Sequence, residues 1–384
     1  MKTDLKNIFK LLHLWVSVPF GITITIICFT GAMLVFEKEI TTLCTGKLTT
    51  VEPKETPLPL ETLAGKVSEV LPEDVKVTGI TVSSEPDEAY KVSLSKPRRA
   101  AVYIDQYTGE IKGRSERLPF FNVMFRMHRW LMDSQPKESG IFWGKMIVGA
   151  STLAFVVILL TGLIVWLPRN RKALKNRLKI VASKGSKRFW YDLHVAGGFY
   201  ALLLLLAMSL TGLTWSFQWY RDGFYKVFGV DTVQQSKPTE KESNAENKRT
   251  NKDGKESNNR ESVNPYEHWQ KAYNAVAAKN LEHKQITISD GSVTVTKAGY
   301  GNQRASDKYT FDKRSGKITS CEPYSESAPR NKIRGWIYSV HVGSWGGLLT
   351  RILTFLAALL GASLPLTGYY LWIKRLVKKS KKKE

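Results

Sequence analysis

The chain has 384 residues, of which 43% are hydrophobic and 24% are charged, and its formal net charge is +23. These averages alone would suit a soluble protein of two or three domains. The distribution of residues excludes a purely soluble protein, because four apolar runs are each long enough to cross a hydrocarbon core of about 30 Å. The runs are Leu14–Phe36, Met146–Leu167, Val195–Tyr220 and Trp345–Ile373.

The positive charge lies beside the apolar runs. Residues 1–10, 169–188 and 374–384 hold most of the excess of Lys and Arg over Asp and Glu. In a chain with four spans these segments share one side of the membrane, and by the positive-inside rule that side is the cytoplasm. We therefore expect membrane lipid as a partner and no nucleic acid.

Two longer connections lie on the opposite side of the membrane, and each reads as a small α+β module. In the first, apolar spacing predicts a helix at Leu60–Leu71, and alternation predicts strands at Val75–Val82, Ala89–Leu94 and Ala101–Ile104. The second module has the same order. Its predicted elements are a helix at Pro265–Ala278 and strands near Gln285–Ser289, Ser292–Thr296 and Lys308–Phe311.

A polar segment, Gln234–Ser262, precedes the second module. It is rich in Lys, Glu, Asn, Ser and Thr and has almost nothing to bury. This composition predicts a disordered linker, to which no function is assigned.

Cysteine is sparse. Cys28 lies in the first apolar run, whereas Cys44 and Cys321 fall in the exported regions. The compartment permits a Cys44–Cys321 disulfide, but free thiols are favoured because nothing in the sequence brings the two together.

The two halves of the chain match as an internal repeat. His13 corresponds to His194, and His128 corresponds to His341. Because each half crosses the membrane outward and returns, we expect parallel repeats with a pseudo-two-fold axis along the membrane normal. Each span also carries the same dipeptide toward its end, at Thr30-Gly31, Thr161-Gly162, Thr211-Gly212 and Thr367-Gly368.

Four of the six histidines occupy these repeat-equivalent positions at the ends of membrane helices. The axis places His13 opposite His194 near the cytoplasmic face, and His128 opposite His341 near the exported face. Two imidazoles without paired cysteines or an acidic cluster fit the axial ligation of b-type haem iron better than a zinc or calcium site. The sequence has no Cys-x-x-Cys-His motif, so we expect two haems per chain, both bound non-covalently.

The Thr-Gly dipeptides place a glycine near each predicted haem. From the helix rise, Gly31 and Gly212 reach the depth of the outer histidines, and Gly162 and Gly368 reach that of the inner ones. Such glycines either let a porphyrin approach the backbone or serve small-residue helix packing, and the sequence favours neither interpretation.

Cations near the outer pair are candidate partners of the haem propionates. Arg351 is the strongest of them, because a cation inside a span is costly unless it is paired. For each of the others, a structural or topological role is the simpler interpretation. The candidates are Arg126, Arg129, Arg334 and Arg351, and no catalytic residue is assigned.

These features resemble the PepSY-associated transmembrane helix family, which includes inner-membrane reductases of ferric siderophores. The resemblance covers nearly the whole chain and implies two PepSY modules in the bacterial periplasm, membrane haem held by histidines, and reduction of an iron chelate outside. The motifs that carry it are His13-Leu-Trp, the turns at Asp105–Ile111 and Asp312–Ile318, Met127-His-Arg-Trp130 and the Thr-Gly spans.

We therefore expect a membrane protein with a four-transmembrane-helix bundle built from two parallel repeats, and two exported α+β PepSY modules. Helices are expected at 1–40, 120–168, 191–222 and 329–375, the second and fourth including a pre-helix. The exported parts are module 1 (41–119), a polar linker (223–263) and module 2 (264–328), and the cytoplasmic parts are a basic loop (169–190) and a basic tail (376–384).

The expected function is that of an inner-membrane di-haem b electron-transfer protein. As a haem-dependent reductase it would pass electrons from an unknown cytoplasmic or quinol donor to a ferric siderophore. The main alternative is a regulator whose PepSY modules restrain an exported peptidase without redox activity. A siderophore permease is weaker, because four spans make a small transport pathway.

Overall fold

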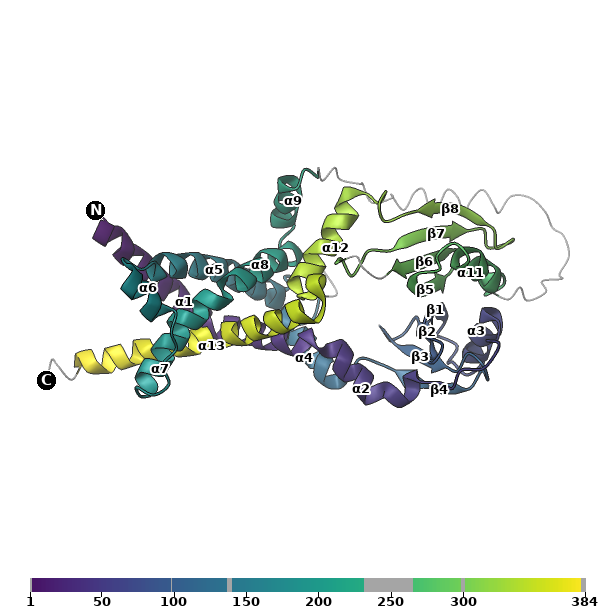
Figure 1. Ribbon diagram of the computed structural model, residues 1–384, viewed down its shortest axis with the longest axis horizontal. Coiled ribbons are helices and arrows are strands. Elements are labelled where there is room, and N and C mark those ends of the chain that lie inside the picture. Colours follow the sequence, from purple (N-terminus) through teal and green to yellow (C-terminus); the bar gives the residue numbers. More distant parts are fainter. Residues whose placement is uncertain (1, 98, 137–139, 231–264, 298–300, 381–384) are drawn as a thin grey trace.

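The computed structural model describes residues 2–97, 99–136, 140–230, 265–297 and 301–380. A helical bundle forms one end of the molecule and a β-sheet forms the other (Figure 1). The first helix begins and the last helix ends at the bundle end away from the sheet. The predicted linker at 234–262 lies outside the described residues.

Within the described residues, four helical segments are long and apolar enough to span a membrane. Their most apolar windows are only 22% to 39% buried inside the protein, so most of this apolar surface is left for lipid. The prediction of a four-span membrane protein is confirmed. The segments are α1 (Lys2–Val35), α5 (Trp143–Trp166), the continuous run from α7 to α8 (Ser186–Ser216) and α13 (Gly347–Ser380).

The bundle has its own apolar core. Helices α1 and α8 each contact both α5 and α13, and they meet around Ile24, Phe155, Leu159 and Leu205. Between α7 (Ser186–Asp192) and α8 (Gly198–Ser216) the helix makes one π turn, η1 (Leu193–Gly197). A π turn inserts an extra residue and re-aims the side chains around it, which is why such turns often occur at functional sites.

Shorter helices connect the bundle to the sheet. Helix α4 packs on α1 and α5, and α12 packs on α8. Both begin with a proline, whose missing N–H leaves no donor unsatisfied in a first turn. The shorter helices on the sheet side are α2 (Glu37–Thr49), α4 (Pro119–Trp130), α9 (Gln218–Val227), α12 (Pro329–His341) and the 3₁₀ turn η2 (Ser344–Gly346). A further short helix, α6 (Arg171–Arg177), lies at the end of the bundle away from the sheet (Figure 1).

Eight described strands form one antiparallel sheet in the order β4-β3-β2-β1-β5-β6-β7-β8. Each half of the chain contributes its own set of four described strands, and the two sets join edge to edge, a contact that the sequence did not predict. The strands are β1 (Val77–Ser83), β2 (Tyr90–Leu94), β3 (Ala101–Ile104), β4 (Ile111–Ser115), β5 (His283–Ser289), β6 (Ser292–Lys297), β7 (Asp307–Phe311) and β8 (Ile318–Glu322).

The junction pairs β1 with β5 over five residues of register. At its centre Thr81 lies opposite Thr287, and their hydroxyl oxygens are 2.9 Å apart. Pairing the two innermost strands covers two edges that would otherwise expose unpaired backbone groups. The sheet therefore binds the two halves of the chain together outside the bundle.

Two helices cover one face of this sheet, α3 (Leu60–Glu69) and α11 (Trp269–Ala277). They also satisfy each other's first turns, because the Gln270 side chain accepts from the Leu60 N–H at 3.0 Å, and the Glu61 carboxylate accepts from the Gln270 N–H at 2.8 Å. The core between helices and sheet is centred on fully buried residues from both halves: Leu63, Val67, Ile80, Val92, Ile286, Ile288, Val293 and Val295.

Candidate functional site

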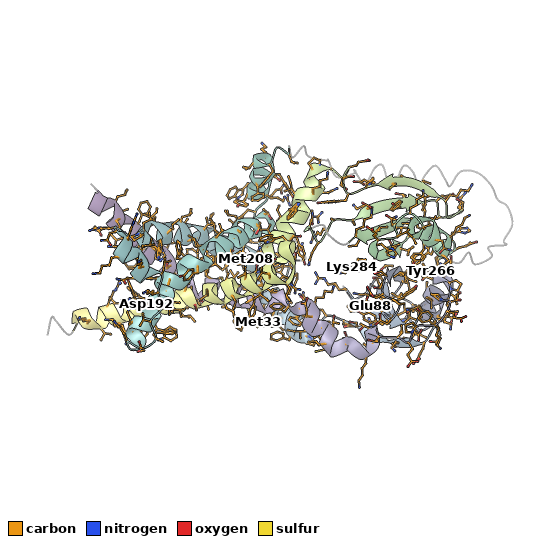
Figure 2. The ribbon with its side chains drawn as sticks, viewed as in Figure 1. Met33, Glu88, Asp192, Met208, Tyr266 and Lys284 are labelled. Atoms are coloured by element: carbon orange, nitrogen blue, oxygen red, sulfur yellow. The ribbon has the colours of Figure 1, made fainter. Side chains whose placement is uncertain are left out.

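The inner histidine pair joins α1 to the π turn before α8. The ring centres of His13 and His194 are 6.4 Å apart, and the ring planes meet at 83°. Asp192, two residues before His194, lies toward the bundle end away from the sheet in Figure 2. Both rings are half-buried between helices.

The outer histidine pair joins α4 to α12. The ring centres of His128 and His341 are 6.1 Å apart, with the ring planes at 55°. Met208, whose carbonyl accepts from His341, lies toward the sheet end of the bundle in Figure 2. These four histidines thus form two facing pairs at two depths of the bundle.

A backbone carbonyl on a neighbouring helix accepts from Nδ1 of each ring. Because a carbonyl oxygen only accepts, Nδ1 carries the hydrogen and Nε2 of the neutral ring keeps its lone pair. In the outer pair, burial lowers the pKa of His341 to about 4 and also lowers the pKa of His128, so both rings are neutral at pH 7. The Nδ1 to oxygen distances are His13–Ile158 3.0 Å, His194–Leu364 3.1 Å, His128–Ile27 2.9 Å and His341–Met208 2.9 Å.

A threonine hydroxyl also lies near Nδ1 of each ring. Each of these hydroxyls donates to a carbonyl of its own helix, so its oxygen is left to accept. These threonines belong to the Thr-Gly dipeptides, and their role as acceptors was not predicted from the sequence. The distances from Nδ1 to the hydroxyl oxygen are His13–Thr161 3.2 Å, His194–Thr367 2.9 Å, His341–Thr211 3.2 Å and His128–Thr30 3.5 Å.

The glycine of each dipeptide faces the ring that its threonine orients. The expected roles were porphyrin clearance or helix packing, and both stay predictions; the nearest atom that a Cβ on each glycine would meet belongs to an imidazole. The reason is steric, since each ring lies against the helix backbone where a side chain would stand. The distance between a Cβ built on the glycine and the Cε1 atom of the facing histidine would be 2.9 Å for Gly31, 3.1 Å for Gly162, 3.1 Å for Gly212 and 3.5 Å for Gly368.

A cavity of about 930 Å³ opens at the inner pair. Both inner histidines and two of the glycines line it, and aromatic residues including Trp166 and Trp372 form apolar walls. The cationic residues of its lining are Lys6, Lys10, Arg169, Arg177 and Arg375.

Two of these cations already serve the C-terminal end of α5. The Lys6 ammonium donates to the Leu167 carbonyl at 2.9 Å, and the Arg177 guanidinium donates to the carbonyls of Val165 and Trp166. Such cations satisfy the free carbonyls of a helix end. The other cationic residues of the lining are Lys10, Arg169 and Arg375. In the sequence these cations are predicted to set the topology, and only the fold brings them to one cavity.

The predicted arginines near the outer pair take different positions. Arg126 donates to the Met132 carbonyl at 2.9 Å and thereby closes the end of α4. Arg129 lies over the Trp130 ring, 5.2 Å from its centre, and Arg334 is exposed on α12.

Arg351 has a counter-ion of its own. Its guanidinium binds both carboxylate oxygens of Glu39, with Nη2 to Oε2 at 2.6 Å, and it also donates to the Val35 carbonyl at 2.5 Å. The hydrogen bond from Arg351 holds the pKa of Glu39 below its usual range. Arg351 therefore has the partner that a cation inside a span needs, and the ion pair ties α13 to the junction of α1 and α2, while its role as a propionate anchor stays a prediction.

The fold and the two histidine pairs define an integral membrane protein whose four-helix bundle holds facing imidazoles at two depths below a joined β-sheet. The chain belongs to the family described as the PepSY-associated TM region, whose model matches residues 11–375. The expected resemblance to that family is thus confirmed. No curated protein matches the chain.

Proposed function

We propose that this protein is a di-haem b electron conduit of the bacterial inner membrane that reduces ferric siderophores on the periplasmic side. The observation that carries the proposal is the pair of facing imidazoles at each of two depths, with every Nδ1 occupied by acceptors and Nε2 left for a metal. An enzyme is expected on this basis, with haem b as its cofactor, two per chain.

The spacing of the rings fits iron ligation. An ion bound by two imidazole nitrogens on opposite faces, each at roughly 2 Å, places the ring centres about 6 Å apart. The observed separations are 6.4 Å and 6.1 Å. Carbonyl and hydroxyl acceptors on Nδ1 fix the tautomer and raise the basicity of a metal-bound imidazole.

The inner cavity suits a flat apolar cofactor with carboxylate groups. His13 and His194 would hold the iron from both faces, and the aromatic walls would cover an apolar ring. Lys10, Arg169 and Arg375 would bind carboxylates at the cavity mouth. When bound, haem supplies reversible one-electron transfer at each site.

The basic end of the bundle is proposed to be cytoplasmic and the sheet to be periplasmic, because Lys and Arg concentrate at the bundle end away from the sheet. We also interpret the chain as two parallel repeats. Equivalent contacts join Gly31 to His128 and Gly212 to His341. The two halves of the sheet, PepSY modules in this proposal, carry their strands in mirrored order about β1 and β5.

The proposed acceptor is a ferric siderophore that meets the outer pair from the sheet side. One electron per iron converts Fe(III) to Fe(II), for which hard oxygen ligands have less affinity. Arg126, Arg129 and Arg334 lie on the helices that carry the outer histidines and would favour an acidic chelate near that site. The donor is proposed to be a cytoplasmic reductant or a quinol.

Absorbance of the purified full chain tests the proposal. Two b-type haems per chain are expected, and His13→Ala and His128→Ala should each lose one of them while keeping the other. His283→Ala is the matched control, because that histidine bonds the Asn280 carbonyl within the sheet, away from both pairs. A colourless protein would refute the cofactor assignment and favour the alternative of a regulator that binds an exported peptidase.

A further inference from the structure

A second cavity adjoins the inner one at the end of the bundle away from the sheet. Its volume is about 470 Å³, and it lies between α7, the segment before α7 and the last turns of α13. It shares Tyr191, Leu371 and Arg375 with the inner cavity. Its other lining residues are Lys184, Lys187, Arg188, Lys374 and Lys378, none of which lines the inner cavity.

The lining of this cavity is strongly basic. Six of its residues are Lys or Arg, and none of its described lining residues is Asp or Glu. Arg188 is neutralised by Asp192, a buried carboxylate at 2.8 Å. Among the described residues, the other five cations have no carboxylate within ion-pair distance. Like charges gathered in one concave site repel one another, and a multivalent anion removes that repulsion.

Exposed apolar side chains also occur on the two helices that line the cavity. Trp190 stands on α7, while Ile373, Leu376 and Val377 stand on α13, and all four are exposed in the protein. Cations beside exposed apolar residues at the end of a membrane helix form the arrangement that receives a phosphate headgroup and its acyl chains. A soluble phosphate would use the cations but not the apolar surface.

We propose that this cavity binds the headgroup of an anionic phospholipid, with two-phosphate lipids of the cardiolipin type as the preferred class. Lys184, Lys187, Lys374 and Lys378 bind the phosphates, and the acyl chains lie along the exposed apolar residues of α7 and α13. The site is independent of the redox proposal, because none of these lysines lines the cavity at the inner histidines.

Lipid binding by the full chain tests this site. The chain is delipidated, placed in phosphatidylcholine nanodiscs with a small fraction of cardiolipin, and its bound lipid is counted by native mass spectrometry. The test variant carries Lys187→Gln, Lys374→Gln and Lys378→Gln. Removing each cation should weaken cardiolipin binding about fivefold, so the triple variant should lose on the order of a hundredfold.

Two further variants separate the cavity from general surface charge. Arg171→Gln, Lys172→Gln and Lys175→Gln remove equal charge from α6, where the three residues are exposed and lie outside both cavities. This control should bind cardiolipin as the unchanged protein does. A triple Lys→Arg variant at 187, 374 and 378 keeps the charge and should keep the lipid, which shows that loss in the Gln variant does not come from misfolding.

The other outcomes overturn the proposal. If the α6 control loses as much cardiolipin binding as the test variant, the lipid is attracted by the general surface charge and not by this cavity. Unchanged binding in the Gln variant, or loss in the Arg variant, would show that these lysines do not act through their charge. Pyrophosphate serves as the soluble ligand for comparison. If it binds the delipidated chain as tightly as cardiolipin does, the ligand of the cavity is a free phosphate and not a lipid.

Discussion

Each imidazole of the two pairs is positioned by two adjacent residues on a neighbouring helix. The threonine of a Thr-Gly dipeptide supplies an acceptor for Nδ1, and the glycine beside it leaves the space that the ring fills, as for Thr161 and Gly162 against His13. Two residues that are adjacent in the sequence therefore supply both the orientation and the space at one place on the helix. This explains why the dipeptide recurs as a unit rather than as a general excess of small residues.

The threonine's contribution is separable from that of the carbonyl. We expect Thr161→Val to raise the midpoint potential of the inner haem, because a weaker acceptor on Nδ1 makes His13 a poorer donor to ferric iron, and to weaken haem retention about tenfold. Redox titration of the purified variant measures the potential. Thr152→Val is the matched control on the same helix, since that hydroxyl bonds only the Val148 carbonyl. An equal shift in both variants would contradict the role of Thr161.

The glycine distances predict a graded response to one added methyl group. A Cβ on Gly31 would lie 2.9 Å from His128 Cε1, whereas a Cβ on Gly368 would lie 3.5 Å from His194 Cε1, which is ordinary contact. Gly31→Ala should therefore lose most of the outer haem, and Gly368→Ala should keep the inner one, as counted by the absorbance of each site. Gly46→Ala, which faces open space, controls for the substitution itself. If Gly31→Ala retains both haems, the role of this glycine is helix packing and not space for the His128 ring.

The helices and strands within each half of the chain follow from local periodicity, whereas the pairing between the halves does not. The expected strand at Ala89–Leu94 is observed as Tyr90–Leu94, and the expected helix at Leu60–Leu71 ends at Glu69. Strand β1 alternates buried and less buried residues, as any half-buried strand does. That pattern does not predict that β5 is the strand with which it pairs. Likewise, histidine spacing predicts the facing pairs, but the acceptors on Nδ1 depend on how helices pack.

The junction of β1 and β5 depends on a close backbone approach at Gly79. A Cβ there would lie 2.6 Å from the Ile288 carbonyl oxygen, and this backbone atom, unlike a side chain, cannot avoid the clash by changing rotamer. Gly79→Ala should therefore open the junction and increase hydrogen exchange in β5. Gly65→Ala, on α3 with open space around it, should instead stabilise the sheet by about 0.5–1 kcal/mol through helix propensity. Unchanged exchange in Gly79→Ala would show that the junction tolerates a wider spacing.

At the scale of the whole molecule, the two sites are built on different kinds of element. The inner histidines belong to the spans themselves, whereas the outer histidines belong to α4 and α12, the short helices that connect the spans to the sheet. Any displacement of the sheet by a bound partner therefore acts first on the outer pair. The ion pair of Arg351 with Glu39 opposes such displacement, because it fixes α13 to the start of α2.

The proposed orientation places Cys44 and Cys321 on the outer side, and both are exposed, while Cys28 is buried in the bundle. A membrane-impermeant maleimide should label these two thiols in intact cells without any engineered residue. With both changed to serine, Lys179→Cys should react only after the membrane is permeabilised, because residue 179 belongs to the basic connection between α6 and α7. Labelling of that cysteine from outside would reverse the topology and, with it, the direction of electron flow.

The order of the two sites along the electron path can be tested by giving the reductant access to one side or to both. In sealed vesicles with the sheet outward and a reductant inside, electrons must enter at the inner pair, so His13→Ala and His128→Ala should both fail to reduce an external ferric siderophore. In detergent, dithionite reaches the outer site directly. His13→Ala should then regain reduction, measured as Fe(II) captured by a ferrous chelator, while His128→Ala should stay inactive because its exit site is missing. Recovery of both variants in detergent, or of neither, would contradict a path that enters at His13 and His194 and leaves at His128 and His341.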